Sequence, residues 1–152
     1  MVLAGAYTED LNIFDIILVD KSYTEGNFAY ALNSVNEHIS EADLKTNEII
    51  EETAKKLNIN YIKGNTLCSE CFDYYIKDIN ELINRFPKSL NIIGAEMEAF
   101  ALFYTAKYLN KKASCLLTVV DSHYKKQEIS SEEREKSLND MIKLALESAI
   151  QI

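Results

Sequence analysis

Two carboxylates, Glu96 and Glu98, flank a methionine in the stretch GAEMEAFALFY, and a third, Asp121, follows the apolar run ending in TVV. A carboxylate can accept hydrogen bonds from the two neighbouring hydroxyls of a ribose, and a partly desolvated carboxyl can keep a proton and act as a general acid. The alternative for Glu96 and Glu98 is structural, because the dipole and free N–H groups of a helix N-terminus favour acids. The sequence leaves both interpretations open.

The elements that must position these acids follow from the apolar pattern. We expect an amphipathic helix over residues 40–58, opened by Ser40 and Asp43 as a capping pair, and a long C-terminal helix from about Ser131. Compact apolar or β-branched runs predict strands near residues 13–19, 59–65, 90–95 and 113–120. The fold class is therefore α/β, with a mixed, largely parallel central sheet flanked by helices. In such sheets ligands collect beyond the carboxyl ends of the strands, where the three acids lie.

Length and composition exclude several classes of protein. The 152 residues, with few Gly and Pro, predict a single domain over 1–152, and the net charge of -8 argues against a nucleic-acid surface. No segment approaches the roughly 20 apolar residues of a membrane span. Three cysteines are too few for a disulfide framework, which favours a reducing, cytoplasmic location. Cys68 and Cys71 lack a second cysteine pair, so we expect no metal site.

Several motifs in order along the chain resemble one enzyme family. GAEMEAFALFY, TVVDSH and SSEEREKSLNDMIKLALES resemble the C-terminal half of the bacterial hexameric purine nucleoside phosphorylases, of the nucleoside phosphorylase superfamily. KGNTLCSECF is similar to the strand and loop before that family's base pocket, and GAYTEDLNIFDIIL to the stretch after its phosphate loop. The resemblance implies a purine nucleoside as substrate, phosphate as co-substrate, no cofactor and a homo-oligomer.

The resemblance also assigns roles to residues. Asp121 would protonate purine N7, and Arg134 would approach Asp121 and promote that transfer. Glu98 would hold the ribose hydroxyls while Met97 packs against the sugar and Phe72 against the purine. Ala95 and Glu96 complete the implied substrate-binding set. Residue type alone leaves an ordinary structural role open for Phe72, Met97 and Arg134.

Two departures from the family bear on phosphate. The family's N-terminal third, which carries the glycine and arginines that clamp phosphate, has no counterpart in this sequence. Residues 2–5, which resemble the remaining phosphate-loop segment, place Leu3 where the family has a hydroxyl residue, and leucine cannot donate to an oxyanion. We therefore expect a phosphorylase-type protein with impaired catalysis. The alternatives are a non-catalytic nucleoside-binding or oligomerising module, and hydrolysis with water as the nucleophile.

Overall fold

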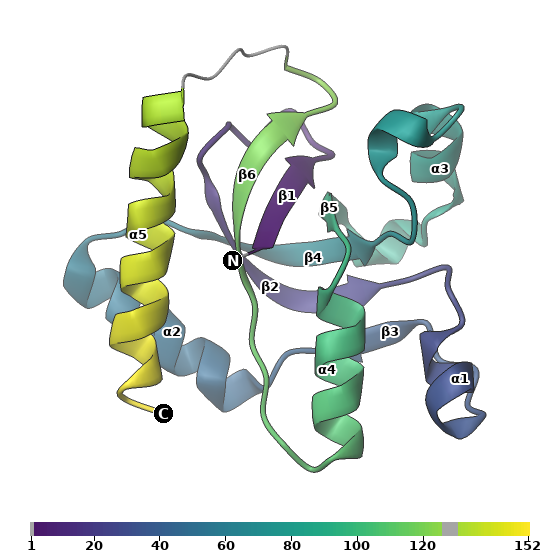
Figure 1. Cartoon of the computed structure of the whole chain (residues 1–152), viewed down its shortest axis with the longest axis horizontal. Coiled ribbons are helices and arrows are strands. Elements are labelled where there is room, and N and C mark those ends of the chain that lie inside the picture. The colour runs from purple at the N-terminus through teal and green to yellow at the C-terminus, as the bar shows by residue number, and fades with distance from the viewer. Residues whose placement is uncertain (1, 126–130) are drawn as a thin grey trace.

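The computed structural model describes residues 2–125 and 131–152, apart from the side chains of residues 2, 131 and 133–137. Its strands are β1 (Val2–Ala6), β2 (Ile16–Tyr23), β3 (Ile39–Glu41), β4 (Ile62–Cys68), β5 (Ile92–Glu96) and β6 (Leu116–Ser122). Its helices are α1 (Phe28–Asn33), α2 (Leu44–Leu57), α3 (Ile79–Arg85), α4 (Ala99–Tyr108) and α5 (Ser131–Ala149), with short 3-10 turns η1 (Asp73–Tyr75) and η2 (Lys88–Leu90). The order confirms the α/β class (Figure 1).

The sheet closes on itself. Strands β2, β4, β5, β1 and β6 are hydrogen-bonded in that order, and β6 pairs again with β2, while β3 extends the sheet from the second half of β2. The β1–β6, β2–β4 and β4–β5 pairs are parallel and form the longer ladders. The β1–β5, β2–β6 and β2–β3 pairs are antiparallel. The sheet is therefore mixed and largely parallel, as predicted.

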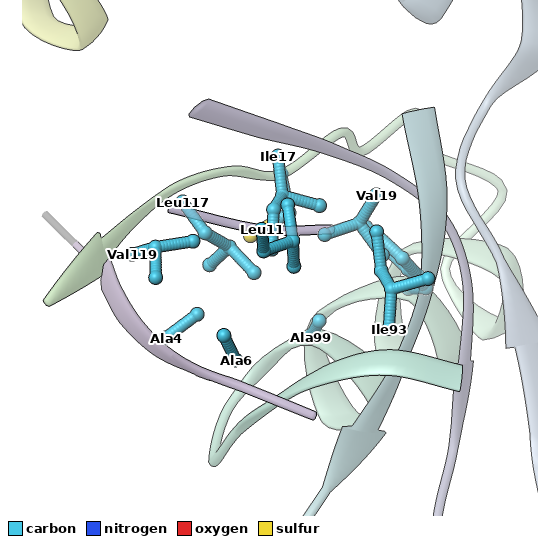
Figure 2. Packing of buried hydrophobic residues seen from close by; sticks show 11 residues of the cluster. Ala4, Ala6, Leu11, Ile17, Val19, Ile93, Ala99, Leu117 and Val119 are labelled. Carbon is cyan, nitrogen blue, oxygen red and sulfur yellow. The ribbon is translucent and has the colours of Figure 1, made fainter. Parts of the chain in front are cut away.

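Apolar side chains from the strands fill the ring. Figure 2 shows Ile17, Leu117 and Val119 pointing toward Ala4 and Ala6 of β1, and all five are buried. They recur at alternate positions because successive side chains of a strand point to opposite faces. The small alanines of β1 leave room for the larger side chains that face them, so one packed cluster joins β1, β2 and β6.

Helices cover the outside of the ring. Helices α2 and α5 pack against each other, and α5 also contacts β6. Helix α4 contacts β2, β3 and β4, and α1 packs beside α4 (Figure 1). Within the part of the chain that the structure describes, no helix combines the length and apolar character needed to cross a bilayer.

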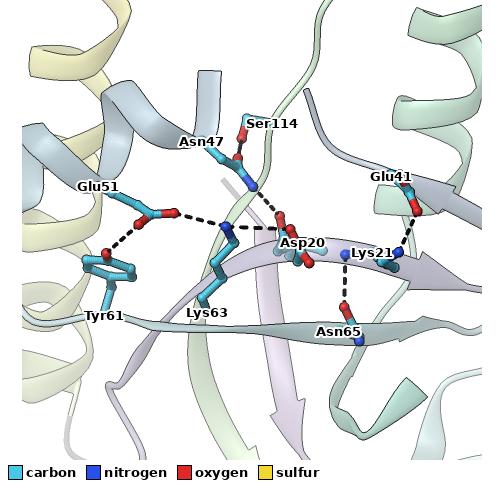
Figure 3. Close-up of polar contacts among 10 residues, drawn as sticks. Asp20, Lys21, Glu41, Asn47, Glu51, Tyr61, Lys63, Asn65 and Ser114 are labelled. Atoms are coloured by element: carbon cyan, nitrogen blue, oxygen red, sulfur yellow. Dashed lines mark hydrogen bonds and ion pairs between the residues drawn. The ribbon is translucent and has the colours of Figure 1, made fainter. Parts of the chain in front are cut away.

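Side-chain contacts link β2 and β4 to α2. Figure 3 shows Lys63 between Glu51 of α2 and Asp20 of β2, with Nζ–Oε1 and Nζ–Oδ1 distances of 3.0 and 3.7 Å. Nearby, the β2–β4 register shifts, and the Asn65 side chain accepts a hydrogen bond from Lys21 N at 3.1 Å. The polar end of Asn65 thus replaces a backbone partner at the irregularity.

Some predicted boundaries were wrong. Ser40 lies in β3, and α2 instead begins after Asp43, whose Oδ1 accepts a hydrogen bond from Thr46 N at 2.9 Å. The helix ends at Asn58 with φ of 54°, as predicted. The predicted strand over 59–65 lies at 62–68, and the segment interpreted as a phosphate loop is strand β1. The strand arises because residues 2–6 pair with β6 on one side, and Gly5 and Ala6 also pair with β5 on the other.

Candidate active site

A cavity of about 460 Å³ opens where several strands end. Its lining consists of residues 3–5 of β1, Ser69 and residues 71–73 after β4, residues 95–98 at the end of β5, and residues 120–121 near the end of β6. Strands β4 and β5 are parallel and end together, with Cys68 opposite Glu96, and β1 runs antiparallel to β5 and brings its parallel neighbour β6 to the same place. Segments far apart in the sequence therefore meet here. The cavity is the first candidate for a ligand site.

Most residues that the sequence singled out line this cavity. They are Phe72, Ala95, Glu96, Met97, Glu98 and Asp121. The remaining one, Arg134, lies in α5, and its side chain is outside the part of the chain that the structure describes. The structure therefore brings together the six side chains at one place and leaves the predicted contact between Arg134 and Asp121 a prediction.

The buried carboxylate of Glu96 is held by hydrogen bonds within the fold. Its Oε1 accepts hydrogen bonds from Ser22 Oγ and Thr66 Oγ1, both at 3.0 Å. Its Oε2 accepts hydrogen bonds from the backbone N–H groups of Glu98 and Ala99, at 2.7 and 2.6 Å. Burial raises the pKa of Glu96, and these four donors oppose that rise. The helix-terminus explanation therefore applies to Glu96, which satisfies free N–H groups at the start of α4.

Glu98 lies two residues further on and is exposed. It occupies the N-cap position of α4, yet its side chain makes no capping bond. Within the described residues its carboxylate accepts one hydrogen bond, from Met97 N at 3.3 Å. Both oxygens retain acceptor capacity toward the cavity, as a carboxylate that binds two hydroxyls requires.

Asp121 reaches the cavity through an irregularity in β6. Ala4 pairs with Val119 and Gly5 with Asp121, so Val120 is an extra residue in the β1–β6 ladder. Such bulges redirect side chains and are frequent beside active sites. Gly5 also pairs with Ala95 of β5, which places β1 between the two walls of the cavity. Burial, and then the charge of Asp73, raise the pKa of Asp121 above its ordinary value.

Asp73 is a site residue that the sequence analysis missed. It lines the cavity beside Phe72, and it also lines an adjoining cavity of about 330 Å³ with Tyr7 and Asp121. Burial raises the pKa of Asp73, whereas the Tyr7 hydroxyl and the charge of His123 lower it. The Tyr7 hydroxyl lies close enough to Asp73 to affect that pKa but makes no well-formed hydrogen bond within the described residues. The one signal in the sequence was an acid directly after the predicted aromatic.

Phe72 and Met97 supply apolar surface to the cavity. Their side chains are 52% and 45% exposed although both are large and apolar. Phe72 makes an edge-on contact with Tyr75 at a ring-centroid distance of 6.0 Å, which leaves the rest of its surface open. An exposed aromatic at a cavity mouth is suited to a planar ligand.

The charged residues of the cavity are all acidic. They are Asp73, Glu96, Glu98 and Asp121, and among the residues that the structure describes no Lys or Arg lines it. Arg85 lies elsewhere and forms a two-pronged ion pair with Glu25, with N–O distances of 3.2 and 2.7 Å. The described part of the cavity therefore suits uncharged, hydroxyl-rich or basic ligand groups better than a phosphate dianion.

Cysteine chemistry plays no visible part in the cavity. Burial raises the pKa of Cys68 to about 12, so it remains a thiol, while Cys71 is exposed at the rim. In the described segments no three His, Cys, Asp or Glu side chains are grouped so that they could hold a metal ion.

Comparison with known proteins places the chain in a family. The family model described as "Phosphorylase superfamily" matches residues 3–151. The DeoD-type 2 purine nucleoside phosphorylase of Vibrio parahaemolyticus is 32% identical over 148 residues, which cover 97% of this chain and 61% of the relative. The DeoD-type enzyme of Mycoplasma genitalium is 34% identical over 145 residues, or 94% of this chain and 59% of the relative.

The chain thus spans about three fifths of the length of the curated relatives it matches. The family match runs through every strand of the ring and every segment that lines the cavity. The chain belongs to the Phosphorylase superfamily.

Proposed function

We propose that this chain carries the nucleoside-binding half of a purine nucleoside phosphorylase-type site. The observation that carries the proposal is the convergence of Phe72, Glu98 and Asp121 on one cavity, from the ends of three different strands and the segments just after them. The similarity to purine nucleoside phosphorylases supports the choice of ligand.

The ligand would be oriented by two contacts of different kinds. Glu98, the carboxylate with free acceptor capacity, would accept hydrogen bonds from the two ribose hydroxyls. Phe72 would lie against the purine, and Met97 would pack against the sugar. Glu96 would contribute indirectly, because its bonds to Glu98 N and Ala99 N fix the turn from which Glu98 projects.

Asp121 would act as the general acid. In phosphorolysis a phosphate oxygen forms a bond to the anomeric carbon, and the bond from that carbon to the purine nitrogen breaks with its electron pair moving into the base. The proton of Asp121 passes to N7 and neutralises the leaving base. Such a transfer typically contributes about 10²–10⁴-fold to the rate. The raised pKa of Asp121 favours its protonated form.

The part of the site that would bind phosphate, the nucleophile, is poorly suited to an anion in the described residues. Leu3 lines the cavity with a side chain that donates no hydrogen bond, and all charged lining residues within the described part of the chain are acidic. Each charge-assisted contact to an anion is worth about 1.5–3 kcal/mol, so the absence of several would slow the reaction by orders of magnitude. We infer that the chain on its own binds nucleoside but catalyses phosphorolysis poorly.

As part of this proposal, copies of the chain associate with one another. The exposed apolar side chains of Leu102, Ile142 and Leu146 surround a second cavity of about 610 Å³, bounded by α4, α5 and the start of β6. Exposed apolar surface of this kind favours self-association. Sedimentation velocity over a range of protein concentrations measures it, and a monomer at every concentration would contradict it.

The decisive experiment measures nucleoside binding and phosphate-dependent purine release separately. Glu98→Ala should abolish binding, whereas Glu48→Ala, which removes an exposed glutamate of α2, should leave it unchanged. Unaltered binding in Glu98→Ala would contradict the proposed site. Robust phosphate-dependent turnover that disappears in Asp121→Asn would support the general acid and contradict the inferred weakness of the phosphate half.

A further inference from the structure

The carboxylates of Asp73 and Asp121 both lie next to Gly5 in the cavity. A Cβ built on Gly5 would be 2.5 Å from Asp121 Oδ1 and 3.6 Å from Asp73 Oδ2. Both side chains line the main cavity and the adjoining one, so both face the space where a base would lie. The charge of Asp73 raises the pKa of Asp121, so an ionised Asp73 favours the protonated form of Asp121.

A third polar group points to a ligand at this place. Tyr7 is 4% exposed, its hydroxyl has no hydrogen-bond partner in the described residues, and it lines the adjoining cavity with Asp73 and Asp121. A buried hydroxyl without a partner is costly and is commonly explained by an absent water or ligand. Tyr7 therefore adds a polar group with unused hydrogen-bonding capacity to the adjoining cavity.

The surroundings decide which carboxyl keeps the proton. Burial raises the pKa of Asp73, but the Tyr7 hydroxyl and the charge of His123 oppose that rise. Among the residues that the structure describes, no such group opposes the rise at Asp121, whose pKa is raised by burial and by the charge of Asp73. The pair therefore offers a donor at Asp121 and an acceptor at Asp73.

We propose that the Asp73–Asp121 pair makes this site selective for 6-aminopurine nucleosides over 6-oxopurine nucleosides. Adenine presents an acceptor, N7, and a donor, its 6-amino group, side by side on one edge. Protonated Asp121 donates to N7, and ionised Asp73 accepts from the amino group. The inference rests on the proposed function and adds a specificity residue, Asp73, to it.

The same pair disfavours a 6-oxopurine. The corresponding edge of guanine, and of hypoxanthine with the same 6-oxo group, presents two acceptors. The 6-oxo oxygen would face the ionised Asp73 without a proton between the two oxygens. An unpaired polar group in a desolvated site weakens binding strongly. Discrimination by such a two-point contact corresponds to about tenfold or more in affinity.

The test is a calorimetric titration of the full chain with adenosine, inosine and purine riboside, which lacks any 6-substituent. We expect adenosine to bind about tenfold or more tightly than inosine, with purine riboside between them. Equal affinity for adenosine and inosine, or tighter inosine binding, would overturn the inference while leaving the nucleoside site standing. Failure of all three to bind would overturn both the inference and the proposed function.

Substitution of Asp73 gives the second arm. In Asp73→Asn the amide can donate to a 6-oxo group, so the adenosine-to-inosine affinity ratio should fall about tenfold or more. Asp140→Asn, which removes an exposed acid of α5, is the matched control and should keep the wild-type ratio. An unchanged ratio in a folded Asp73→Asn, with folding checked by its urea midpoint, would overturn the role of Asp73. The ligand comparison in the unaltered chain stands whether or not the variant folds.

Discussion

Asp121 and Gly5 are neighbours across β6 and β1, and the Asp121 carboxylate occupies the space that a side chain at Gly5 would fill. Gly5 does not have a positive φ, so its backbone would accept an alanine. The absence of a side chain at Gly5 is therefore a requirement of the site and not of the strand.

Gly5→Ala should displace the Asp121 carboxylate. The new methyl group would meet a short side chain that can rotate away, so we expect a change in unfolding free energy within about 1 kcal/mol and a clear loss of nucleoside affinity. The measurement is a double-mutant cycle with Asp121→Ala. The glycine substitution should have no further effect on binding in the Asp121→Ala background, and additive losses would show that it acts elsewhere.

Glu96 and Glu98 should respond in opposite ways to removal. Glu96→Ala leaves two buried hydroxyls and two backbone N–H groups without their acceptor, so we expect a loss of stability of about 2–5 kcal/mol. Glu98→Ala removes an exposed side chain and should change stability by less than about 0.5 kcal/mol while abolishing binding. Urea unfolding and calorimetric titration of both variants give the comparison. A stable, non-binding Glu96→Ala would contradict the division of roles.

Asp121→Asn should stabilise the fold in a pH-dependent manner. The folded-state pKa of Asp121 is raised, first by burial and then by Asp73, so its ionised form carries a cost above that pKa. The variant should be more stable than the wild type at about pH 7, and its advantage should vanish as pH falls below the ordinary value of about 3.9. Among the described residues, the nearby titrating groups are Asp73, Tyr7 and His123, and Arg134 is predicted to approach as a further charged group. Urea midpoints across this range check the sign, and a pH-independent difference would refute it.

The start of α2 offers a test of helix capping. Asp43→Ala should cost about 1 kcal/mol, because Asp43 accepts hydrogen bonds from both Thr46 N and Thr46 Oγ1. These bonds lower the pKa of Asp43, so its contribution is present above the ordinary value and is lost as pH falls through the folded-state pKa. Ser40→Ala is the control, since the Ser40 hydroxyl has no hydrogen-bond partner in the described residues. A larger loss in Ser40→Ala than in Asp43→Ala would restore the cap predicted from the sequence.

The case of Ser40 shows why local pattern misplaced a boundary. Ser40 followed three residues later by Asp43 fits a capping pair, and the residues after Asp43 are helical. In the structure Ser40 pairs with Ser22 of β2, a partner that no local window contains. The pairing of β1 with β5 and β6 was missed for the same reason, because a five-residue strand of small residues has a weak pattern of its own.

The sequence by itself determined the α/β class, the terminal helix and the chemical types at the site, because periodicity and residue type are local properties. Residue type alone could not separate Glu96 from Glu98, which are identical side chains two residues apart, although the family resemblance assigned the ribose contact to Glu98. Only the tertiary structure showed that the hydroxyls of Ser22 and Thr66 donate to Glu96, that Glu98 accepts a single hydrogen bond among the described residues, and that Asp73 and Asp121 both lie next to Gly5. The physical reason is strand register: the partner of a carboxylate is set by long-range pairing, and a slip of one residue would turn each side chain to the opposite face.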